Sequence, residues 1–159
     1  MLRTAFALLI VLAAVGTASA DIRGVYMVEP RALGYFLGDT ITRTAEIETD
    51  ADDEILTASM PQPGALNYWL DLRDANVVSE RNGDGRLHRV TLTYQTFYAA
   101  LDTRRMEIPP VEIALKTANG TEIAKIPGFG FVMSPLREVL PRKFNEEDGY
   151  LLPDARPVE

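Results

Sequence analysis

The chain has 159 residues, no cysteine, and a formal net charge of −7 from 16 Lys and Arg against 23 Asp and Glu. This acidity argues against nucleic acid or an anionic lipid surface as a partner, because both require clustered basic side chains. The absence of cysteine excludes disulfides, thiol catalysis and thiolate metal sites.

The first twenty residues are typical of a secretory signal peptide. Arg3 supplies a positive charge, Ala5 to Val15 are apolar, and Ala18-Ser19-Ala20 has the small side chains that a signal peptidase requires. We predict cleavage after Ala20 and a periplasmic location. The alternative is an uncleaved anchor, but the apolar run is shorter than the roughly 20 residues of a membrane-spanning helix. Residues 21–136 are expected to form one domain, and the charged residues 137–159 a disordered tail.

Short apolar runs with a period of two, separated by Gly and Pro, indicate an all-β fold. A first strand is predicted at Ile22 to Val28 and a second at Thr40 to Glu48. Arg43 interrupts the apolar alternation of the second strand, which favours a bulge or an edge position there. Further strands are predicted at Leu66 to Leu72 and at Leu87 to Tyr98, the longest.

The C-terminal half is predicted to contain a hairpin and one more strand. Residues 111–115 alternate before Asn119-Gly120, a pair that accepts positive φ at both central positions of a type I′ turn. Residues 129–133 alternate again. Seven or eight strands at this spacing predict an immunoglobulin-like antiparallel β-sandwich.

Groups suited to catalysis are few. His88 is the only histidine. No motif places a serine or threonine beside it, so we expect a surface residue of a strand and assign no catalytic residue. A hydrolase that uses two carboxylates is the enzyme alternative that stays open.

Asp50, Asp52, Asp53 and Glu54 belong to an acidic connection after the second strand. They are candidate calcium ligands, because a hard cation prefers several carboxylate oxygens. The run lacks the glycine and the spacing of an EF-hand loop, so a hydrated surface loop is the competing interpretation.

Four aromatic residues, Tyr35, Trp69, Phe129 and Phe131, are candidates for binding a protein partner on an exposed sheet face or edge. The competing interpretation is that aromatic side chains of this kind belong to the core.

The segment Glu29 to Thr40, with the sequence EPRALGYFLGDT, resembles the opening of the MxaA family of periplasmic accessory proteins of methanol dehydrogenase. Residues 69–74, 92–95 and 108–110 are similar to later features of that family, and the resemblance covers most of residues 25–136. Family members usually continue into a transmembrane helix, so the resemblance implies a short form. A looser similarity is to the envelope proteins called BatD.

The resemblance to MxaA implies a role in maturing a PQQ-dependent methanol dehydrogenase, with calcium insertion as the activity and a dehydrogenase subunit as the partner. It implies no particular calcium ligand. A generic envelope binding module with another protein partner is the first alternative function, and the carboxylate-based hydrolase is the second.

Overall fold

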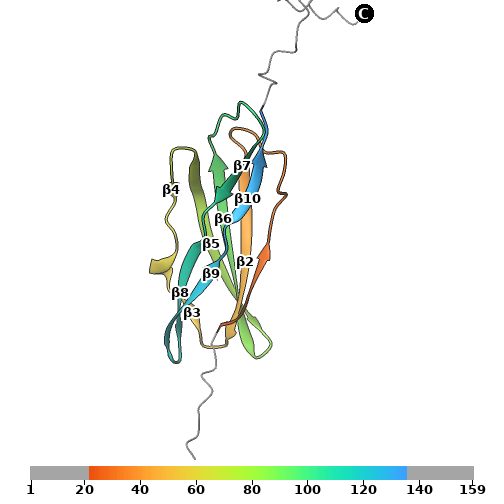
Figure 1. The fold of residues 1–159 in the computed structure, drawn as a ribbon. Coiled ribbons are helices and arrows are strands. Elements are labelled where there is room, and N and C mark those ends of the chain that lie inside the picture. The colour runs from red at the N-terminus through yellow and green to blue at the C-terminus, as the bar shows by residue number, and fades with distance from the viewer. Residues whose placement is uncertain (1–21, 136–159) are drawn as a thin grey trace, which may run out of the picture.

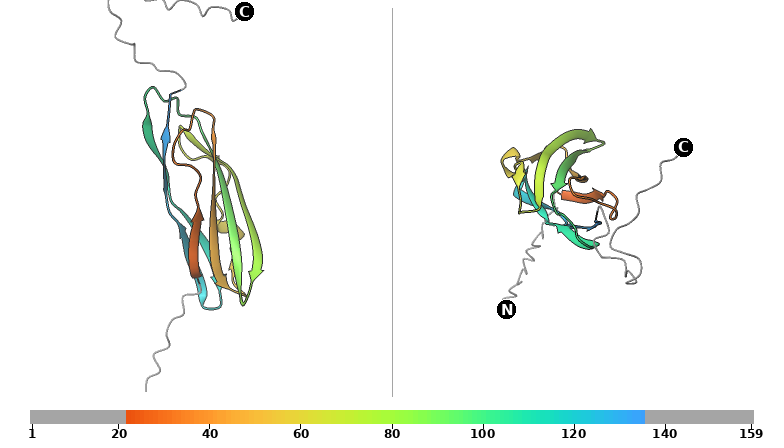
Figure 2. Two further views of the ribbon diagram at one scale, coloured as in Figure 1. Left: turned by 90° about the vertical axis from the view of Figure 1, so that its right-hand side faces the viewer. Right: turned by 90° about the horizontal axis from the view of Figure 1, so that it is seen from above.

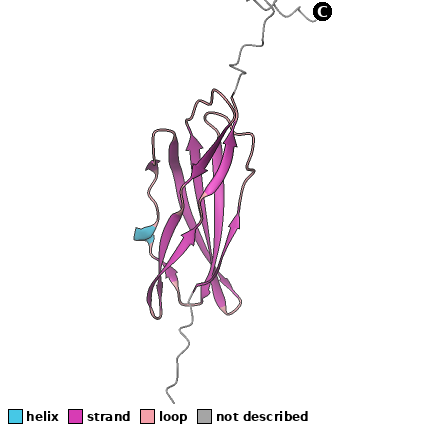
Figure 3. Ribbon diagram, viewed as in Figure 1, coloured by secondary structure: helices cyan, strands magenta, loops and turns pink. Residues whose placement is uncertain are grey.

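The computed structural model describes residues 22–135. The predicted signal peptide with its cleavage site and the predicted disordered tail lie outside these residues. Strands dominate the described chain, with one short 3-10 turn beside them (Figures 1 and 3). The strands are β1 (Ile22–Val28), β2 (Thr40–Asp50), β3 (Glu54–Ile55), β4 (Gly64–Ala65), β5 (Leu70–Asn82), β6 (Gly85–Thr96), β7 (Arg104–Ile108), β8 (Val111–Thr117), β9 (Gly120–Ile126) and β10 (Phe129–Met133), and the 3-10 turn is η1 (Thr57–Ser59).

The strands form two antiparallel layers. One layer is a five-stranded sheet with the order β1-β2-β6-β5-β4. The other contains the pairs β7–β10 and β8–β9, with β3 added at the outer side of β8. The two layers face one another in Figure 2. The predicted all-β sandwich is therefore confirmed. Within residues 22–135, no helix has the length and apolar character needed to cross a membrane.

The second layer is one long hairpin that is interrupted in the middle. β7 continues into β8, and β9 continues into β10. Ile108 pairs with Phe129 and Val111 pairs with Ile126, so the register is the same on both sides of the interruption. Prolines lie between these pairs on both strands. Because proline has no N–H to donate, it stops the ladder without shifting the pairing.

Several boundaries differ from the sequence prediction. β5 begins at Leu70, after a loop over residues 66–69, and runs to Asn82. The hairpin near Asn119-Gly120 is confirmed, but its predicted type I′ turn is wrong. Thr117 pairs with Gly120, and no residue of the described chain other than glycine has a positive φ. The turn is therefore centred one residue earlier than predicted.

The core lies between the inward rows of β2 and β6 and the bent hairpin. Every second residue is buried from Ile41 to Thr49 on β2 and from His88 to Thr96 on β6. Arg43 belongs to this inward row. The pairing of β2 with β6 has no register shift, and β2 is not an edge strand. The predicted bulge or edge position at Arg43 is therefore wrong.

Arg43 tolerates burial because its charge is compensated. Its Nε donates to Glu29 Oε2 at 2.9 Å, and its Nη2 donates to Glu29 Oε1 at 2.6 Å. Nη2 also donates to the Pro127 carbonyl at 2.8 Å, and the guanidinium lies 5.3 Å from the centre of the Phe129 ring. A buried charge is stable when it is paired and hydrogen-bonded in this way.

Candidate protein-binding surface

Three of the four aromatic residues predicted to bind a partner lie in the core. Tyr35, Phe129 and Phe131 are 3, 9 and 0 % exposed. The Tyr35 ring meets Phe131 edge-on at 5.4 Å, and the half-buried Trp69 lies 6.3 Å from the same ring. The expectation that Tyr35, Phe129 and Phe131 are exposed is wrong. For the two phenylalanines the reason is that alternation along β10 turns them toward the opposite sheet.

Three loops lie side by side at the end of the sandwich where β10 ends, at the top of Figure 1. They comprise residues 29–39, 66–69 and 97–103, and we call them the apical loops. The Gly38 amide donates to the Thr96 carbonyl at 2.7 Å, at the start of the third loop. The Phe97 amide donates to the Trp69 carbonyl at the same distance, which joins the second and third loops.

The apical loops expose large apolar side chains. Seven of the large hydrophobic residues that are exposed in the described chain lie here, with exposed fractions between 37 and 87 %. They are Leu33, Phe36, Leu37, Leu66, Tyr68, Phe97 and Leu101. The other four such residues lie on strands β1, β5 and β9. Among residues 22–135, apolar exposure is thus concentrated at one end of the sandwich.

A tight turn in the first apical loop presents two of these side chains. Gly34 and Gly38 have φ values of 80° and 89°, which glycine adopts without steric cost. The Asp39 carboxylate accepts a hydrogen bond from the Phe36 amide at 3.0 Å. Tyr35 therefore points into the core, while Phe36 and the following Leu37 remain exposed.

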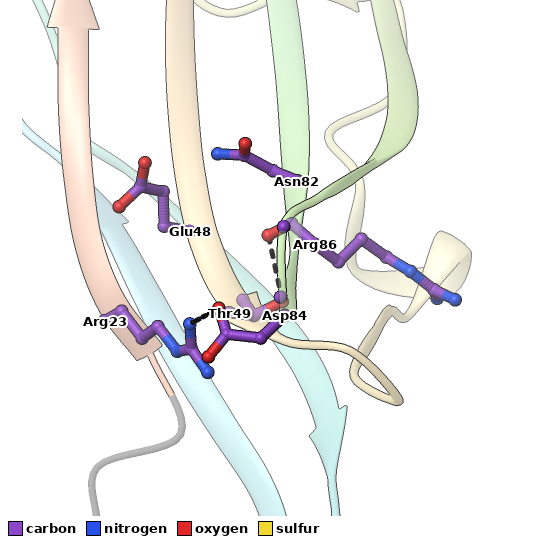
Figure 4. Close-up of a pocket in the computed structure, with 8 residues that line it drawn as sticks. Arg23, Glu48, Thr49, Asn82, Asp84 and Arg86 are labelled. Carbon is purple, nitrogen blue, oxygen red and sulfur yellow. Dashed lines mark hydrogen bonds and ion pairs between the residues drawn. The ribbon is translucent and has the colours of Figure 1, made fainter.

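The opposite end, which we call the basal end, contains the β5–β6 and β8–β9 turns and the β2–β3 connection. It carries a polar depression of about 290 Å³, lined in part by Arg23, Glu48 and Asp84 (Figure 4). Arg23 lies 2.7 Å from an Asp50 carboxylate oxygen and 3.0 Å from an Asp84 oxygen. Hydrogen bonding to Arg23 holds the pKa of Asp84 below its ordinary value. Arg23 thus already pairs with two of the carboxylates at this end.

The other candidate calcium ligands do not meet at one point. Asp53 is buried, and its Oδ2 accepts from the Asp50 amide at 3.2 Å. Asp52 is exposed, and Glu54 lies 3.7 Å from Arg86. No group of three His, Cys, Asp or Glu side chains within residues 22–135 is placed to hold a metal ion. The convergent carboxylates expected of a calcium carrier are not formed by this loop.

His88 is buried rather than exposed, which corrects the sequence prediction. It is 1 % exposed, with Nδ1 at 2.7 Å from Ser79 Oγ and Nε2 at 3.2 Å from Thr49 Oγ1. Burial is the main effect that lowers the pKa of His88, and the charge of Arg86 lowers it further. The backbone of Asp53 opposes this shift. The burial was foreseeable, because His88 shares the parity of Val90, Leu92 and Tyr94.

Comparison with models of protein families, with curated proteins and with solved structures finds no match. The resemblance to MxaA is therefore an expectation from the sequence alone.

Proposed function

We propose that this protein is a binding module of the cell envelope that holds a protein partner at its apical loops. The observation that carries the proposal is the gathering of seven exposed apolar side chains on three adjacent loops. Exposed apolar side chains that gather on adjacent loops mark interaction sites more often than apolar side chains scattered singly over a surface. Loops positioned by a rigid scaffold are also the usual place for binding residues.

The sequence resemblance to MxaA supports a narrower form of the proposal. In this form the protein is a periplasmic accessory protein that acts in maturation of a PQQ-dependent methanol dehydrogenase, with calcium insertion as the implied activity. The strongest part of the resemblance, Glu29 to Thr40, includes the whole first apical loop. An unrelated envelope protein as partner is the broader alternative, and it predicts the same contact surface.

The test is capture of partners from envelope extract by the tagged mature protein, with and without calcium. One variant replaces the three most exposed apical residues, as Leu33→Ser, Tyr68→Ser and Leu101→Ser together. Truncation of central hot-spot side chains costs 2 kcal/mol or more, so we expect capture to fall by roughly 30-fold or more. A methanol dehydrogenase subunit among the captured proteins would support the narrower form.

The matched control is Val28→Ser with Ile123→Ser, which removes comparably exposed apolar side chains from β1 and β9. We expect this control to capture the partner as the wild type does. Equal capture by the apical variant, or equal loss in both variants, would refute the proposal. Circular dichroism of each variant verifies that the fold is retained.

A further inference from the structure

Three neighbouring strands bring a serine, a histidine and a threonine together on the inward side of the five-stranded sheet. Ser79 on β5 is the direct cross-strand partner of His88 on β6, and His88 is the partner of Ile47 on β2. Thr49 follows two residues after Ile47 and therefore points to the same side. The imidazole contacts Ser79 Oγ at 2.7 Å through Nδ1 and Thr49 Oγ1 at 3.2 Å through Nε2.

The hydrogen bonds of Thr49 assign the proton on His88. The Thr49 hydroxyl donates to the Asp50 carbonyl at 3.1 Å, and a carbonyl oxygen only accepts. Because the hydroxyl has one proton, Thr49 Oγ1 accepts from Nε2–H of His88. Nδ1 then carries the free lone pair, and the Ser79 hydroxyl donates to it. The histidine is thereby held in the tautomer that a general base for Ser79 requires.

Ser79 is exposed although its base is buried. β4 pairs with β5 only at Asp71 and Leu72, so no described strand pairs with the outer edge of β5 beyond the register shift between Leu72 and Asp74. Ser79 is therefore an exposed residue at a sheet edge to which no described strand is paired, and a small electrophile can approach it from solvent.

We propose that Ser79 is a reactive serine that His88 activates, and that it accepts an acyl group from an activated ester. Its Oγ forms a bond to the ester carbonyl carbon, and the bond from that carbon to the leaving alcohol oxygen breaks. The serine proton passes to His88 Nδ1 and then to the departing oxygen. A nucleophile within hydrogen-bond reach of a base that a third group orients is the signature of such activation.

The surroundings of His88 keep it unprotonated near neutral pH. Arg86 on β6 repels the imidazolium form of His88. Arg81 on β5 is the cross-strand partner of Arg86 and lies on the same side of the sheet. A hydrogen bond to the Asp53 backbone on the β2–β3 connection and the charge of Glu54 on β3 favour the charged form, but burial outweighs them and the pKa of His88 is lowered. This site is separate from the apical loops, so the proposal does not depend on the proposed function.

The test is incubation of the mature protein with p-nitrophenyl acetate, followed by intact mass spectrometry and peptide mapping. We expect one acetyl group on Ser79 and release of p-nitrophenol, which ionises in solution and is detected as p-nitrophenolate. Ser59 is an internal control, because its Oγ donates to the Leu56 carbonyl at 2.7 Å and has no histidine beside it. Ser79→Ala should remove the adduct, and His88→Gln should slow acetylation by about 100-fold or more.

Two further measurements separate activation from folding. In the wild type, the acetylation rate should rise with pH and level off above a pKa lower than the usual value for histidine. Thr49→Val should slow the reaction, and Thr49→Ser, which restores the acceptor for Nε2–H, should recover it. Equal labelling of Ser59, an unchanged rate in folded His88→Gln, or a rate that rises with hydroxide without levelling would overturn the proposal.

Discussion

The two ends of the sandwich are built from the same strands but present different chemistry. The apical end displays apolar side chains on three loops. At the basal end, Arg23 is paired with Asp50 and Asp84, and buried His88 is hydrogen-bonded through both ring nitrogens. Polar groups that satisfy one another stabilise the fold, whereas exposed apolar groups gain free energy only when something else covers them.

Loop length accounts for much of this difference. At the basal end, two-residue turns at residues 83–84 and 118–119 join β5 to β6 and β8 to β9. Such turns leave few side chains to present. The first apical loop spans residues 29–39, which is long enough to turn one aromatic ring into the core and two apolar side chains outward. Long ordered loops are commonly functional for this reason.

The largest expected effect is at the base of the first apical loop. Glu29→Gln keeps the shape of the side chain but leaves the charge of Arg43 buried and unpaired. We expect a loss of about 3–5 kcal/mol in the free energy of unfolding, measured by urea titration. Glu112→Gln, which breaks an exposed pair with Lys125, is the control and should cost less than about 1 kcal/mol. Equal losses would show that the pair of Glu29 with buried Arg43 contributes no more to stability than an exposed ion pair.

A smaller effect is expected at the basal end when the pH falls. The pKa of His88 is lowered in the folded protein, so the unfolded chain binds the proton first. The contribution of His88 to the free energy of unfolding is therefore complete above about pH 6.5, and it is lost as the pH falls from there toward the pKa of His88 in the folded protein. Urea titrations at several pH values should show a steeper decline for the wild type than for His88→Gln. Identical slopes would contradict this assignment.

The smallest effect is expected from Arg23→Gln on the basal surface. Its ion pairs are exposed and screened by salt, so the urea midpoint should hardly change. The pKa of Asp84 should nevertheless rise toward its ordinary value, because hydrogen bonding to Arg23 is the main cause that lowers it. An NMR titration of the Asp84 carboxyl measures this shift. An unchanged pKa would show that Arg23 is not the group that lowers the pKa of Asp84.

Side-chain alternation along the chain was sufficient to predict the β class, several of the strands and the inward row of β6, because the period of two follows from strand geometry alone. Arg43 and His88 have the inward parity of their strands, but their polarity led to the predictions of a bulge or edge position for Arg43 and a surface position for His88, and both predictions were wrong. Burial of those two residues depends on partners far along the chain, Glu29 for the arginine, and Thr49 and Ser79 for the histidine. Such partners become visible only when the strands are paired.

The apical surface likewise required the tertiary structure. Strand alternation does not apply to loops, so it does not distinguish buried Tyr35 from exposed Phe36 and Tyr68. Those orientations depend on the turn that Asp39 closes and on hydrogen bonds between loops that are distant in sequence. The period of a strand is a local property and can be read from the order of the residues. The exposure of a loop side chain depends on which parts of the folded protein cover it.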